Sequence, residues 1–169
     1  MRPANTLVGI ACNLVPKHTT PAVDGDGARL SAVHEASRAR QRATSQVHFL
    51  TEHIRFITHQ GKQILLIDLC NCSSTEVEKI FRAVPESVTT RPRGSVLILS
   101  DFSGASIDQD AIRIMKETAV FDKPYVRKSA WTGSKNVPPD LHASLGAFSR
   151  REFHVFETRQ DALAWLVKD

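Results

Sequence analysis

The chain has 169 residues, 41% of them apolar and 24% charged, which suffices for one domain with a buried core and is too short for two. Residues 1–46 carry six basic and three acidic side chains, and residues 47–169 are nearly balanced, with 16 basic and 15 acidic. A nucleic-acid-binding domain concentrates basic charge on one face. Because the basic residues here occur in scattered pairs such as Arg127-Lys128 and Arg150-Arg151, we expect solvated surface and no nucleic-acid partner.

Residues 1–46 are predicted to be a disordered basic tail. From Pro16 to Gln46 the chain is rich in Thr, Ala, Ser, Gly and Arg and has few large apolar residues. Such a composition buries too little surface to offset the entropy lost on ordering. The alternative for part of this tail is a short helix over residues 28–43, where Leu30 and Val33 fall near helical spacing.

The cysteines and the apolar runs indicate where the protein resides. Cys70 and Cys72 are separated by one residue, too close for an unstrained disulfide, and Cys12 leaves the number odd. No apolar run approaches the ~20 residues that cross a bilayer. We therefore expect a cytoplasmic protein without a membrane span.

The pattern from residue 54 predicts a β-hairpin. Residues 54–59 alternate in polarity, Gln60-Gly61-Lys62 supplies a turn, and residues 64–67 are apolar without a break. A continuous apolar strand is typical of a position at the centre of a sheet, buried on both faces.

Helices and strands alternate after the hairpin. Ser73 to Glu76 has a capping-box pattern, and the apolar residues that follow fall at i, i+3, i+4 and i+7 of a helix that frays near Pro85. The buried strand at residues 96–99 is reached by a helical crossover, so we expect it to be parallel to the strand at residues 64–67, with a right-handed connection. A second helix is predicted to begin near Asp108.

The last third of the chain adds two strands and two helices. A strand is predicted over residues 125–131, and a short helix after Pro139 has Leu141, Leu145 and Phe148 as its inner face. A final strand over residues 153–156 precedes a helix capped by Thr158. The order is ββαβαβαβα, whereas a receiver domain, suggested by acids at two strand ends, begins βαβ.

Four segments, in this order, resemble the recurrent segments of the SpoIIAA-like family of the STAS superfamily. They are residues 56–62, 96–104, 122–126 and 156–166, and the resemblance spans about residues 52–168. It implies that residues 47–169 form an α/β domain whose five-stranded, mostly parallel sheet has an N-terminal hairpin and four flanking helices. The family is related to anti-sigma-factor antagonists and to CRAL-TRIO lipid carriers, and the resemblance implies no enzymatic activity and no cofactor.

In the antagonists of this fold, a serine or threonine at the start of the helix after the third strand is phosphorylated and switches partner binding. Here residues 101–110 lack the Asp-Ser-Ser/Thr-Gly pattern, and Asp108 and Asp110 place acids at the helix start. Ser103 and Ser106 are candidates for modification, but we favour turn residues with an N-cap at Asp108.

No motif in the sequence indicates catalysis or metal binding. Gly133-Ser134-Lys135 lacks the flanks of a phosphate-binding loop. Cys70 and Cys72 have no partner cysteine pair at zinc spacing. We therefore expect no catalytic residue, no metal and no cofactor.

Two classes of function fit the sequence. In the first, the loops at residues 102–110 and 131–139 dock a protein partner, because both leave the carboxyl ends of neighbouring strands. This regulatory module is compatible with a homodimer. In the alternative, an apolar pocket takes a small lipid or aromatic ligand, although simple core packing also explains its predicted lining, Phe102, Tyr125, Trp131 and Phe148.

Overall fold

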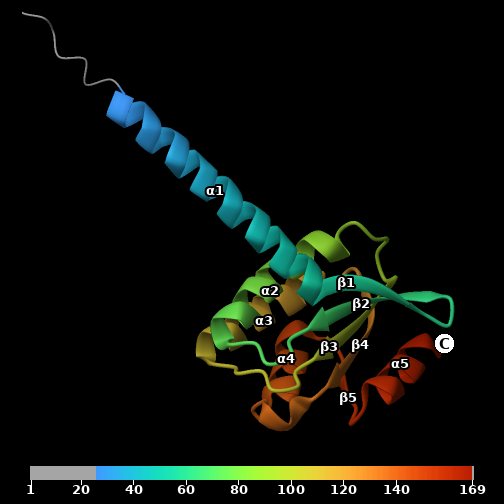
Figure 1. Cartoon of the computed structure of the whole chain (residues 1–169). Coiled ribbons are helices and arrows are strands. Elements are labelled where there is room, and N and C mark those ends of the chain that lie inside the picture. Colours follow the sequence, from blue (N-terminus) through green and yellow to red (C-terminus); the bar gives the residue numbers. More distant parts are fainter. Residues whose placement is uncertain (1–25, 169) are drawn as a thin grey trace, which may run out of the picture. The chain divides into compact units, whose positions relative to one another are not determined.

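The computed structural model describes residues 26–168, and its first element is helix α1, Asp26–His53 (Figure 1). The predicted disorder is therefore wrong for residues 26–46, and the short helix considered over residues 28–43 lies within α1. The side chains of residues 34–48 are exposed, so burial does not explain this helix. Ala and Arg are its commonest residues, and their high helix propensity needs no burial. Residues 1–25 of the predicted tail lie outside the described residues.

The chain divides into two units at residues 40 and 41. In the second unit, a five-stranded sheet has the order β1-β2-β3-β4-β5, with β1 antiparallel to β2 and all other neighbours parallel. The expected hairpin and mostly parallel sheet are confirmed. The strands are Ile54–His59, Lys62–Asp68, Val96–Asp101, Val126–Thr132 and His154–Val155.

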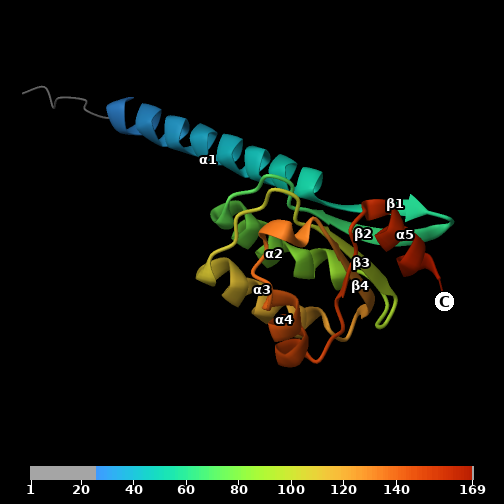
Figure 2. The same cartoon turned by 90° about the horizontal axis from the view of Figure 1, so that it is seen from below.

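Four helices of this unit flank the sheet: α2 (Ser74–Val88), α3 (Gln109–Asp122), α4 (Leu141–Ser149) and α5 (Arg159–Val167). Because the parallel strands follow one another in chain order and their crossovers are right-handed, α2, α3 and α4 lie on the same face. Helix α5 covers the other face, over β3 and β4 (Figure 2). Alternate residues of β2 and β3 therefore enter two separate cores.

Polar caps fix where three of these helices begin. Ser73 and Glu76 form the predicted capping box at α2, and the Asp108 carboxylate accepts a 2.9 Å hydrogen bond from the Ala111 N–H at α3. Thr158 accepts a 3.1 Å bond from the Asp161 N–H at α5. All three caps predicted from the sequence are confirmed, because each depends on residues only three positions apart.

Helix α2 does not end at Pro85 but continues to Val88. A proline has no N–H to donate to the carbonyl four residues earlier, here that of Phe81. The Thr118 hydroxyl of α3 donates to this buried carbonyl at 3.1 Å. A side chain from the neighbouring helix thus replaces the missing backbone bond, and the helix passes through the proline.

Helix α4 differs from expectation at Phe148, which is 58% exposed although it was predicted to face inward. The buried residues of α4 are Leu141, Leu145 and Ser149, spaced four apart. This rotates the buried stripe away from Phe148 and towards Ser149, whose hydroxyl donates to the Leu145 carbonyl at 2.7 Å. Serine can be buried there because the helix itself satisfies its hydroxyl.

Candidate functional site

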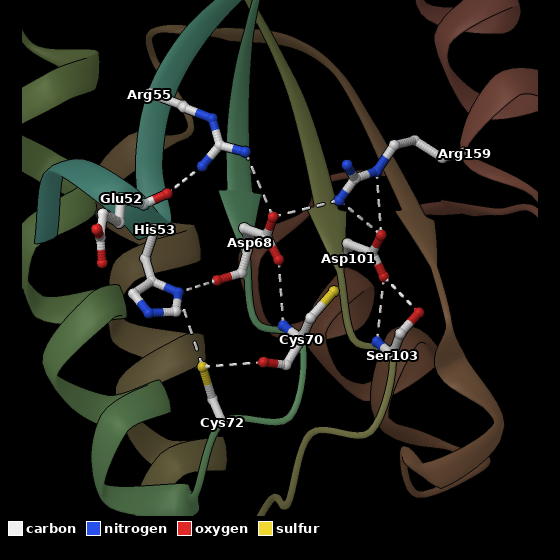
Figure 3. Close-up of polar contacts among 9 residues, drawn as sticks. All are labelled: Glu52, His53, Arg55, Asp68, Cys70, Cys72, Asp101, Ser103 and Arg159. Atoms are coloured by element: carbon white, nitrogen blue, oxygen red, sulfur yellow. Dashed lines mark hydrogen bonds and ion pairs between the residues drawn. The ribbon is translucent and has the colours of Figure 1, made fainter. Parts of the chain in front are cut away.

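Two aspartates meet at the carboxyl ends of the central parallel strands. Asp68 ends β2 and Asp101 ends β3, and the two are direct register partners. Arg159, the first residue of α5, reaches across the sheet end to both, with N–O distances of 2.8 Å to Asp101 and 3.4 Å to Asp68 (Figure 3). Arg55 of β1 lies 3.5 Å from Asp68. At this edge of the sheet, Arg159 therefore bridges a pair of carboxylates.

Each aspartate also shapes the loop that follows its strand. The Cys70 N–H donates to Asp68 at 3.2 Å, and the Ser103 N–H and hydroxyl donate to Asp101 at 3.1 and 2.7 Å. In both cases the carboxylate binds the backbone two residues later, as a short acidic side chain does in an Asx turn. The two loops therefore leave the sheet with the same local geometry.

These contacts set the ionisation of the pair. Burial disfavours the charged form of both aspartates, but hydrogen bonds from Cys70 to Asp68 and from Ser103 to Asp101, together with Arg159, outweigh it and lower both pKa values. Burial disfavours the charged guanidinium of Arg159 as well, yet the two carboxylates raise its pKa. All three groups are therefore charged near neutral pH, and the arginine stabilises both carboxylates in that form.

The two thiols of this region are held in the protonated form. Burial, followed by the hydrogen bond to Asp68 and the charges of Asp101 and Asp68, raises the pKa of Cys70 to about 12. Burial and the charges of Glu76 and Asp68 raise the pKa of Cys72 to about 11. Because the thiolate is the reactive form, neither cysteine is an activated nucleophile near neutral pH.

Backbone hydrogen bonds join two loops at this edge and tie the second loop to the end of β4. The Asn71 N–H donates to the Ser103 carbonyl at 2.8 Å, the Ser106 N–H to Cys72 at 2.9 Å, and the Phe102 N–H to Thr132 at 2.9 Å. We call the exposed residues that these loops and the start of α3 present the carboxyl-edge surface: Asn71, Ser103, Gly104, Ser106, Asp108, Gln109 and Asp110.

Two glycines allow the loops to approach so closely. Gly104 and Gly133 have φ values of 71° and 68°, a conformation that favours glycine. A Cβ on Gly104 would lie 2.3 Å from Oδ1 of Asn71, and one on Gly133 would lie 2.4 Å from the backbone nitrogen of Ser103. A side chain at Gly133 would push its loop away from the Ser103 backbone, whereas one at Gly104 would displace the Asn71 side chain.

The structure separates the residues predicted to form the site. Ser103, Ser106, Asp108 and Asp110 lie together on the carboxyl-edge surface, and Asp108 is the N-cap that was favoured for it.

The predicted aromatic residues lie apart from these polar ones. Phe102 and Trp131 are 0% and 3% exposed, with ring centroids 4.7 Å apart, so they pack in the core and present no area to a partner. Tyr125 precedes β4 at the opposite end of the sheet, and Phe148 is exposed on α4.

These four aromatics line no common cavity in the described part of the chain. Of two hollows lined by Trp131, one has a volume of about 20 Å³, room for a water molecule and not for a lipid, and the other about 210 Å³. Neither is lined by Phe102, Tyr125 or Phe148. The expected aromatic-lined pocket is therefore not formed by these residues.

Sequence reasoning missed Arg159 as a site residue. It occupies the first turn of a helix, where a cation opposes the helix dipole and costs stability unless an acid compensates it. An arginine at this unfavourable position could have indicated an acidic partner. The two aspartates at the strand ends are that partner.

Comparisons with known proteins show the fold. A scan against protein-family models finds no match, and neither does a search of the curated proteins. A search of solved structures matches an uncharacterised protein of the DUF3478 family with a SpoIIAA-like fold, from Shewanella loihica PV-4. The identity is 16% and the TM-score 0.52, over 67% of this chain and 91% of that one.

The chain therefore has a SpoIIAA-like α/β fold, and the resemblance stated from the sequence is confirmed at the level of the fold. A likeness at this identity carries no function with it. Within residues 26–168, no helix combines the length and apolar character that a membrane span needs.

Proposed function

We propose that this protein is a non-enzymatic regulatory module that docks a protein partner through the carboxyl-edge surface. The observation that carries the proposal is the set of backbone hydrogen bonds that join the two loops to each other and to the end of β4, which fixes the backbone of that surface before any partner arrives. A surface ordered on folding loses little further conformational entropy on binding, and this favours affinity. Function in open α/β folds also concentrates at the carboxyl ends of strands.

The chemistry of the same edge supports binding rather than catalysis. The carboxylates of Asp68 and Asp101 are engaged by Arg159 and by the loops, and lowered pKa values make them weak bases. The thiols of Cys70 and Cys72 have raised pKa values and are weak nucleophiles. These groups hold the surface in place, and none of them is available as a strong base or nucleophile for catalysis. Free thiols at both cysteines agree with a reducing cytoplasm.

A phosphate switch at Ser103 is not needed for this function and is disfavoured by its surroundings. The Ser103 hydroxyl donates to Asp101 at 2.7 Å. Phosphorylation would remove that bond and place a second anion beside a carboxylate. Arg159 already compensates that carboxylate, so we propose docking that is independent of phosphorylation.

The test uses a partner identified by pull-down and two matched variants. Gln109→Arg introduces a long cation on the carboxyl-edge surface, and Gln63→Arg makes the same exchange at an exposed position near the other end of the sheet. We expect Gln109→Arg to weaken the partner's Kd by about tenfold or more and Gln63→Arg to change it by less than about twofold. Equal Kd values for wild type and both variants would exclude the carboxyl-edge surface as the docking site.

A further inference from the structure

The fold gathers basic residues that are scattered in the sequence. Two segments enter the last two strands, residues 123–128 at β4 and residues 150–152 before β5, and they face one another across a hollow of about 500 Å³. We call it the basic hollow. It is lined by one acid, Glu152, and by five cations: Lys123, Arg127, Lys128, Arg150 and Arg151. It lies at the amino ends of β4 and β5, the opposite edge from the carboxyl-edge surface.

Two of these cations are oriented by neutral acceptors. Arg151 donates to the Ala119 carbonyl at 3.3 Å and to the Ser129 hydroxyl at 2.5 Å. Lys128 donates to the carbonyls of Trp165 and Lys168. Carbonyl and hydroxyl oxygens hold a cation in place without neutralising it, so its charge remains available to an anion.

The carboxylate nearest to Arg151 compensates it only in part. Asp122 is 2% exposed, and its Oδ1 has no hydrogen-bond partner. Burial raises the pKa of Asp122 to about 7, against the lowering effect of Arg151. Burial lowers the pKa of Arg151 to about 10, which leaves the guanidinium charged near neutral pH. The positive charge at the floor of the basic hollow is therefore not cancelled.

The rim of the hollow carries further positive charge. Lys123 and Arg150 are exposed, and neither makes an ion pair with another residue within 26–168. By contrast, Arg82 and Arg113 on α2 and α3 are each paired with an acid on their own helix. Lys123 and Arg150 thus bring two cations without an ion pair to the rim of the hollow, and its one acid, Glu152, lies 3.6 Å from Nε2 of His154.

We propose that the basic hollow binds a small organic anion that carries two or more phosphate groups. Its volume falls within the range of small-molecule sites, roughly 300–1,000 Å³. Guanidinium forks match the oxygens of a phosphate, and several cations around one concavity suit a polyvalent anion. The rings of Trp165 and His154, with centroids 4.3 Å apart and tilted by 41°, line the same hollow and offer apolar contact to the organic part. Free metabolites and phosphorylated lipid headgroups both provide this chemistry.

The test is a calorimetric titration with inorganic tripolyphosphate at low ionic strength, where screening is weak. The Lys123→Gln/Arg150→Gln double variant removes two rim cations, and Arg82→Gln/Arg113→Gln removes the same charge elsewhere. Both pairs are exposed, and thermal melting checks that the fold is retained. We expect saturable binding that the rim variant weakens by about tenfold or more and the control variant by less than about twofold.

Three results would overturn the proposal: no saturable binding by the wild type, equal weakening by the two double variants, or citrate binding as tightly as tripolyphosphate. Binding to vesicles of phosphatidylcholine with a minor fraction of phosphatidylinositol bisphosphate then distinguishes a lipid headgroup from a free metabolite as the ligand. Vesicle binding lost in the rim variant supports a lipid headgroup, and tripolyphosphate binding without vesicle binding supports a free phosphorylated metabolite. Since the hollow and the carboxyl-edge surface lie at opposite ends of the sheet, the rim variant should leave protein docking unchanged.

Discussion

The bond that carries helix α2 through Pro85 makes a quantitative prediction about stability. Thr118→Val removes the hydroxyl that donates to the Phe81 carbonyl and keeps nearly the same side-chain volume. Thr118 is 6% exposed, so water has little access to the carbonyl left behind. An unsatisfied buried acceptor costs about 1–3 kcal/mol, and we expect Thr118→Val to lower the free energy of unfolding by this amount.

A second variant separates this cause from a general loss of packing. Pro85→Ala restores an N–H that can donate to the Phe81 carbonyl within the helix, so the hydroxyl is no longer its sole donor. In the Pro85→Ala background we expect Thr118→Val to cost at least ~1 kcal/mol less than in wild type. Urea denaturation of the four proteins in this double-mutant cycle measures the difference. Equal costs in the two backgrounds would refute the argument that the hydroxyl replaces the proline's missing bond.

Three further predictions concern the carboxyl edge. Arg159 helps to lower the pKa of the two aspartates, so their stabilisation is complete above the unfolded pKa of 3.8 and lost as pH falls through the folded values. Arg159→Met should therefore be less stable than wild type near pH 6, with the difference closing as pH falls below 3.8, and a gap in urea midpoints that does not depend on pH would contradict this. Cys70, with its pKa raised to about 12, should react with iodoacetamide at pH 8 far more slowly than a cysteine in an unfolded peptide, and equal rates would show an activated thiol. Ser106→Asp should bind the identified partner within about threefold of wild type, because Asp108 and Asp110 already place negative charge there, whereas a change of about tenfold would restore the phosphate switch.

Much of the fold could be predicted because its signals are local. The capping box at Ser73, the cap at Thr158 and the hairpin turn at Gln60-Gly61 each involve residues at most three positions apart, and the structure contains all three. The continuous apolar runs identified the central strands for the same reason. Disorder was predicted for the segment that forms α1 because its composition buries little apolar surface. Helix propensity, which needs no burial, favours a helix there.

The candidate site was less predictable because its contacts join distant residues. Asp68 and Asp101 were visible as strand ends, but their pairing depends on the register of β2 and β3. The bridge by Arg159 depends on α5 crossing to the other face of the sheet. Phe102 and Trp131 look the same in the sequence whether they bind a partner or each other. Only packing distinguishes these cases.

The sequence by itself determined the order of the elements, the ends of the capped helices and the fold they build, because neighbouring residues interact whatever lies further along the chain. The tertiary structure alone decided which polar groups meet. It bridged two aspartates with one arginine and packed Phe102 and Trp131, two residues of the predicted pocket lining, in the core. It also brought the pairs Arg127-Lys128 and Arg150-Arg151 together around one hollow. Charges separated along the chain interact strongly only when folding brings them within a few ångströms, and no local pattern records that distance.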